Sequence, residues 1–101
     1  MSKPPDALWK IGEVAAALDL PQNVLRFWEA RFDQVQPIQR GRGRRSYRPE
    51  DVDLLRGIKH LLYVQGYTIR GAQKLLRENG TLFVQAIGRG EQRTLELPKS
   101  A

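Results

Sequence analysis

The chain has 101 residues, enough for one domain, or one domain and a tail, around a single modest core. Its 17 lysines and arginines outnumber 11 acidic residues, and the net charge of +6 favours an anionic partner: nucleic acid first, then a membrane surface or an acidic protein. The lack of cysteine excludes a disulfide framework, a thiolate zinc site and a cysteine nucleophile. No segment of signal-peptide character and no apolar run of membrane-spanning length occurs, so we expect a soluble cytoplasmic protein associated with the nucleoid.

Two short helices are predicted after residues 1–8, which are rich in proline and expected to be flexible. The first helix, over residues 11–18, places Ile11, Val14, Ala15 and Leu18 on one apolar face. The second, over about residues 21–30, opens with Pro21, whose missing N–H costs nothing at a first helical position. Because a brief break at Asp19 and Leu20 separates them, the pair has the helix-turn-helix pattern.

The second of these helices has two different faces. Its apolar stripe consists of Val24, Leu25 and Trp28, with Phe32 next along it, and its other face carries Gln22, Asn23, Arg26 and Phe27. In a helix-turn-helix the second helix enters the major groove, where arginine can chelate guanine and asparagine can pair with adenine. The alternative is an ordinary solvated helix face.

An arginine-rich hairpin is predicted next, after Pro37 has stopped any continuation of the helix. Residues 38–40 and 45–47 are strand candidates on either side of a glycine-containing turn. No nearby acid neutralises the arginines, so Arg42, Arg44 and Arg45 are expected to bind phosphates. Tyr47 is expected to clamp the hairpin inward and is included in the predicted DNA-contact set. The alternative is a solubilising charge run or a disordered arm.

Two further helices are predicted in the C-terminal half. The first runs from Pro49 to a stop at Gly66, and its broad buried face consists of Val52, Leu54 or Ile58, Leu55, Leu61 and Leu62. The second is capped by Thr68 and ended by Gly80. Residues 80–101 form a tail whose apolar patch, residues 82–87, is a candidate oligomerisation or partner segment without a heptad repeat.

No enzyme signature is present. The single histidine, His60, without cysteine cannot make a transition-metal site of the usual kind. Glu50, Asp51 and Asp53 are explained by the positive end of a helix rather than by a catalytic carboxylate pair. We therefore expect neither catalysis nor a cofactor or metal.

The order of these elements resembles the MerR family of bacterial transcription regulators over about residues 9–76. Four pieces carry the resemblance: "IGEVA" in the first helix, "LRFWE" in the second, "GRRSY" followed by "EDV", and "GYTI" before the last helix. The resemblance implies a mainly α, winged helix-turn-helix domain over residues 9–79, with about four helices and a two-stranded wing. It also implies sequence-specific binding of double-stranded DNA, contact with RNA polymerase and a homodimer.

The resemblance assigns roles to single residues. It places Asn23 and Arg26 in the groove, Phe27 on the sugar-phosphate edge, and Arg44 and Arg45 on the backbone. Arg42 joins them on charge grounds, and the residues His60 and Tyr63 fall where some relatives touch phosphate. The "LRFWEARF" helix is similar to a branch in which some members carry cobalamin-binding domains, and no such domain lies in this chain.

The long dimerisation helix of typical members is not recognisable after Gly80. The chain is then a fragment of a longer protein, a dimer through residues 82–87, or a monomer that binds alone or by lateral contacts. Two other functions stay open: an architectural or excisionase-like DNA-binding protein, and a protein-interaction module that uses residues 82–87.

Overall fold

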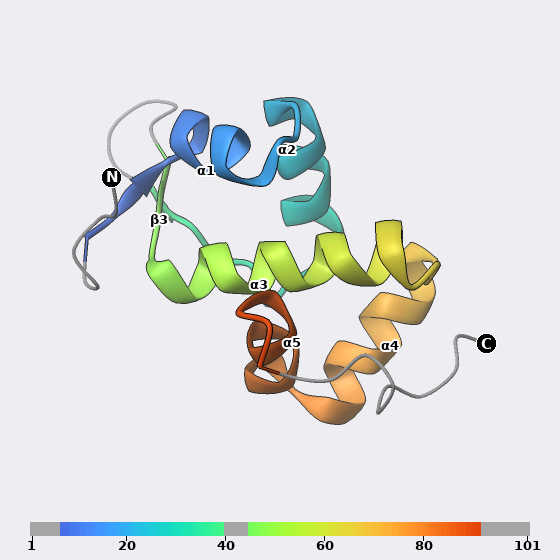
Figure 1. Ribbon diagram of the computed structural model, residues 1–101. Helices are drawn as coiled ribbons and strands as arrows, with labels where there is room; N and C mark the ends of the chain where they lie inside the picture. Colours follow the sequence, from blue (N-terminus) through green and yellow to red (C-terminus); the bar gives the residue numbers. More distant parts are fainter. Residues whose placement is uncertain (1–6, 40–44, 92–101) are drawn as a thin grey trace. The chain divides into compact units, whose positions relative to one another are not determined.

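The computed structural model describes residues 7–39 and 45–91. They fall into two compact units, Met1–Val52 and Asp53–Ala101, with the boundary inside helix α3 (Pro49–Lys59). The predicted mainly α, winged helix-turn-helix fold is confirmed, and within the described residues it has five α-helices and a three-stranded sheet (Figure 1). The sequence predicted about four helices and a two-stranded wing, so one helix and one strand are additional.

The first unit contains a small antiparallel sheet with the strand order β1-β3-β2. The predicted hairpin is confirmed, because β2 (Ile38–Gln39) pairs with β3 (Arg45–Tyr47) with Ser46 opposite Ile38. The unpredicted strand, β1 (Trp9–Lys10), covers the other edge of β3 and leads directly into α1 (Figure 1). Its two residues are too short to show the alternation that identifies a strand.

The helix-turn-helix consists of α1 (Ile11–Leu18) and α2 (Gln22–Arg31). Between them Asp19 takes the left-handed conformation, with φ 55° and ψ 50°, and the Leu20 N–H bonds to the Ala15 carbonyl at 3.0 Å. Pro21 is extended, with ψ 149°, so it precedes α2 as the cap and is not its first residue as predicted.

The core of the first unit forms where the apolar stripes of α1 and α2 are buried together. The helix α2 ends at Arg31, before Pro37, because Phe32 leaves the helical conformation and is fully buried. The predicted stripes are confirmed at Val14, Ala15, Leu18, Leu25, Trp28 and Phe32.

The second unit begins inside α3 and continues with one wider turn. Regular α-helix ends at Lys59 and residues His60–Val64 form a π-helix, in which the Gln65 N–H bonds to the His60 carbonyl at 3.0 Å. The predicted stop at Gly66 is confirmed, since this glycine has φ 77°.

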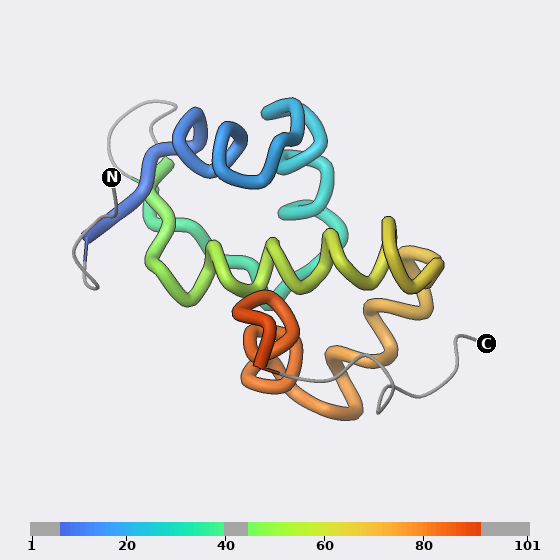
Figure 2. The backbone as a smooth tube through the Cα atoms, viewed as in Figure 1, coloured from blue at the N-terminus to red at the C-terminus, as the bar shows by residue number. Residues whose placement is uncertain are grey.

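Two more helices complete the second unit. The helix α4 (Ile69–Asn79) has its predicted cap, because Thr68 Oγ1 accepts a hydrogen bond from the Gly71 N–H at 2.9 Å. The chain reverses at Gly80 into α5 (Thr81–Gly88), which the sequence did not predict as a helix (Figure 2). None of the helices described is long and apolar enough to cross a membrane.

The helix α5 lies against α3 at two glycines. A Cβ atom on Gly57 would come within 2.1 Å of the Val84 carbonyl oxygen, and one on Gly88 within 2.0 Å of the Asp53 carbonyl oxygen. Both distances are far below contact distance, so the two backbones approach this closely only because neither residue has a side chain. The apolar side of α5, Val84 and Ile87, is buried.

Candidate nucleic-acid interface

The exposed face of α2 gathers four of the predicted contact residues. Gln22, Asn23, Arg26 and Phe27 are all exposed, while Leu25 and Trp28 on the opposite side are buried. Phe27 is a large aromatic side chain with 46% of its surface open to solvent. The face therefore offers amide, guanidinium and aromatic groups together.

One further exposed residue on this face, Arg31, was missed from the sequence. Its guanidinium carbon lies 4.7 Å from the centre of the Phe27 ring, one helical turn away. An aromatic residue and an arginine four positions apart on an exposed helix face were the available signal. The stacked pair extends the basic surface toward the end of α2.

An enclosed carboxylate, Glu29, joins α2 to β3. The Tyr47 hydroxyl donates a hydrogen bond to one of its oxygens, and Arg45 Nη1 lies 2.9 Å from the other. The side chain of Glu29 is only 11% exposed, so these contacts replace most of its hydration. We call these three residues the Glu29 cluster.

The surroundings of Tyr47 keep its phenol protonated. Burial raises the pKa of this hydroxyl above its usual range, and the hydrogen bond to Glu29 and the negative charge of that residue raise it further. The positive charges of Arg45 and Arg26 act in the opposite direction on this pKa. Arg26 is therefore close enough to influence the Glu29 cluster electrostatically.

The Glu29 cluster corrects two expectations. Tyr47 has no exposed surface, so its predicted inward position holds, but it has no surface with which to contact DNA. Arg45 does have an acidic neighbour, contrary to the expectation that no acid neutralises the wing arginines. Glu29 is distant from Arg45 in sequence, and only the fold, which places α2 beside β3, brings the two charges together.

A second polar contact fixes the end of the wing to the start of α3. Asp51, which is buried, accepts from the backbone N–H of Arg48 at 3.1 Å and from its Nε at 3.0 Å. Arg48 also donates from Nη2 to the Gln36 carbonyl at 3.3 Å, and its bond to Asp51 raises the pKa of the guanidinium. Asp51 thus caps the helix as well as lying near its positive end.

The other predicted contacts are placed differently. Arg42 and Arg44 lie outside the described residues. His60 belongs to the π-helix of the second unit, where its Nε2 is enclosed and has no hydrogen-bond partner among the described residues, whereas Tyr63 is exposed. Within residues 7–39 and 45–91 no three acidic or histidine side chains gather as a metal site would require.

Residues 9–79 match the description "MerR HTH family regulatory protein". The chain belongs to this family. It is 33% identical over 89 residues to the "HTH-type transcriptional regulator MlrA" of Escherichia coli (strain K12), covering 88% of this chain and 36% of that protein. It is 38% identical over 53 residues to the protein of the same name from Salmonella typhimurium (strain SL1344), covering 52% of this chain and 22% of the relative.

No solved structure matches the chain significantly. The chain spans about a third of the length of the Escherichia coli relative, and residues 9–79 of the chain are the part that matches the family. The family assignment made from the four sequence pieces is confirmed, and the branch suggested by "LRFWEARF" stays a prediction.

Proposed function

We propose that this MerR-family chain is the DNA-binding part of a bacterial transcription regulator acting in the cytoplasm. It would read double-stranded DNA with α2 in the major groove and rest the wing, residues 38–48, on the backbone or the flanking minor groove. The observation that carries this proposal is the division of α2 into two faces. Its exposed face is polar and basic, and its opposite face is apolar and buried.

Each group on that face has a matching partner on a duplex. Arg26 has the planar donor pair that fits guanine, and Asn23 has the donor and acceptor that fit adenine. Gln22 lies at the first position of α2, where a side chain reaches the groove floor or a phosphate. The Phe27–Arg31 stack suits the sugar-phosphate edge, because the ring meets deoxyribose and the guanidinium meets phosphate.

The wing would add phosphate contacts through Arg42 and Arg44, as their sequence positions predict. If two copies bind one operator, the site should be pseudo-palindromic. A homodimer and a contact with RNA polymerase are part of this proposal, as is regulation comparable to that named for the MlrA relatives.

Selection of bound duplexes from random or genomic DNA tests the proposal and reports the preferred site. Against that site, Arg26→Ala should lose roughly 10- to 100-fold in affinity, because a bidentate base contact discriminates by about 1–3 kcal/mol. Binding to an unrelated duplex should fall much less. Titrations of both duplexes by fluorescence anisotropy measure the two losses.

Arg77→Ala is the matched control, since it removes an exposed arginine of α4 outside the proposed contact set. This variant should reduce the affinity for both duplexes by the same small factor. Equal losses on both duplexes for Arg26→Ala would remove the assigned role of Arg26 in reading bases.

A second candidate, a protein-interaction module, is favoured by the exposed apolar side chains Tyr63, Val64 and Leu82. Absence of any mobility shift at physiological salt, on every duplex tried, would select it. An architectural or excisionase-like role differs again, because its footprints would lie away from promoters and would not change transcription.

A further inference from the structure

We propose that Glu29 is a positioning residue that withholds Arg45 from the DNA backbone, so that the wing gains fewer sequence-independent contacts than its arginines suggest. This inference rests on the proposed function. It concerns which arginines contribute to sequence-independent affinity for DNA and to the salt dependence of that affinity.

The ion pair with Glu29 occupies one side of the Arg45 guanidinium. Its Nη1 is enclosed and lies 2.9 Å from Glu29 Oε1, an ion pair that does not have hydrogen-bond geometry, and the side chain as a whole is only 29% exposed. A phosphate that drew the Arg45 guanidinium fully onto the DNA backbone would have to replace this charged partner, because Glu29 already occupies one of the three guanidinium nitrogens. It would also leave the Glu29 carboxylate, itself 11% exposed, with one charged contact fewer in a poorly hydrated place.

Tyr47 fixes the carboxylate in that position. Its hydroxyl donates to the second oxygen of Glu29, and the ring is fully buried on β3. The carboxylate therefore has a partner on each oxygen, and both partners come from β3. The Glu29 cluster thus links the first residue of β3, Arg45, to α2.

The pairing of Arg45 with Glu29 has a measurable consequence for the salt dependence of DNA binding. Each arginine that neutralises a phosphate steepens the dependence of log affinity on log salt by about 0.9. Arg45, already paired with Glu29, should contribute almost nothing to that slope. Removal of the Glu29 charge should release Arg45, which then adds its share on any duplex.

The experiment compares wild type, Arg45→Gln, Glu29→Gln and the double variant on a selected site and on an unrelated duplex, between 50 and 300 mM KCl. Arg45→Gln should keep the wild-type slope. Glu29→Gln should steepen the slope by about 0.9 on both duplexes, because the released Arg45 can reach a phosphate on either one. The double variant should return to the wild-type slope.

Arg44→Gln serves as the positive control, because Arg44 is a predicted phosphate contact and should flatten the slope by about 0.9. Circular dichroism establishes that each variant is folded. If Glu29→Gln does not fold, Arg45→Gln alone decides, since it leaves Tyr47 bonded to the carboxylate. A slope that is flatter by about 0.9 in Arg45→Gln would overturn the inference while leaving the proposed function intact. Failure of wild type to bind any duplex would overturn the proposed function itself.

Discussion

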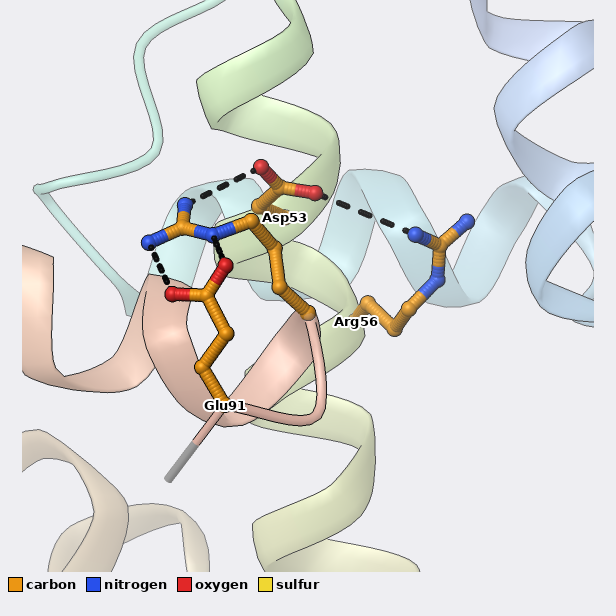
Figure 3. Close-up of polar contacts among 4 residues, drawn as sticks. Asp53, Arg56 and Glu91 are labelled. Carbon is orange, nitrogen blue, oxygen red and sulfur yellow. Dashed lines mark hydrogen bonds and ion pairs between the residues drawn. The ribbon is translucent and has the colours of Figure 1, made fainter. Parts of the chain in front are cut away.

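In the first unit α2 is joined to β3 by an enclosed carboxylate, whereas in the second unit α5 lies on α3 at two glycines. Each arrangement also has charged side chains that link its elements, but their surroundings differ. The Glu29 side chain is only 11% exposed, while in the second unit Arg89 binds Asp53, which is 20% exposed, and Glu91, which is 61% exposed (Figure 3).

The difference indicates where each unit depends on polar groups. In the first unit the hydrogen bond and the ion pair stand in place of lost hydration, so removal of one partner leaves a group that water reaches poorly. In the second unit α3 and α5 pack with their backbones in close contact and with Val84 and Ile87 buried. The ion pairs of Arg89 therefore add little to the stability of this packing. Three substitutions test this contrast.

Gly88→Ala should have the largest effect. The added Cβ would meet the Asp53 carbonyl oxygen at 2.0 Å, and a backbone atom cannot move aside by changing rotamer. The two helices must separate, so we expect the free energy of unfolding to fall by about 3 kcal/mol. Urea denaturation followed by circular dichroism measures the loss.

Gly12→Ala is the matched control on α1, where the new Cβ would lie an ordinary 3.5 Å from Gln22 Nε2. Alanine is a better helix former than glycine, so this variant should be unchanged or more stable by about 0.5–1 kcal/mol. Equal stability of Gly88→Ala and wild type would mean that α5 does not depend on the close approach.

Tyr47→Phe should have an intermediate effect. It removes the hydroxyl that donates to Glu29 but leaves Arg45 in place, and we expect a loss of about 1–2 kcal/mol at neutral pH. The loss should shrink in alkali. Because the folded-state pKa of Tyr47 is raised, its contribution is complete below the unfolded pKa of about 10 and declines as the pH rises further.

Urea unfolding of wild type and Tyr47→Phe, measured at intervals from pH 8 to pH 11, should therefore give free energies of unfolding that converge as the pH rises. Other groups titrate in both proteins and cancel in the difference, including Tyr67, whose pKa is also raised by burial. A constant difference across this pH range would show that the hydroxyl of Tyr47 is not held in its protonated state by the fold.

Much of this contrast lies beyond sequence reasoning, for identifiable reasons. Helical periodicity located α1, α2, α3 and α4, and glycine and threonine located the stop at Gly66 and both ends of α4, because these signals depend on neighbours along the chain. The helix α5 was missed since its apolar residues are continuous from Leu82 to Val84 and give no clear period. The π-helix at His60–Val64 is a single wider turn, and five residues are too few for its altered period to show in the sequence.

The candidate site divides in the same way. The exposed face of α2 was predictable, because the buried position of Leu25 and Trp28 determines which residues point outward. The partnership of Glu29 with Arg45 was not, because it joins residues on separate elements. The wing arginines consequently looked equivalent from the sequence, although the structure gives Arg45 a partner of its own.

Arg89→Gln should have the smallest effect of the three. Its bonds to Glu91 and Asp53 raise the guanidinium pKa and lower that of Glu91, yet Arg89 and Glu91 are open to solvent. Water and salt replace such contacts almost completely. The midpoint of urea unfolding should therefore move less than for Tyr47→Phe, and 0.5 M NaCl should remove what difference there is. Because Glu91 has a lowered pKa, the part of that difference that comes from its bond to Arg89 should also be lost as the pH falls through this pKa. A loss matching that of Tyr47→Phe would mean that the second unit, like the first, depends on its charged links, and the contrast between the two would fail.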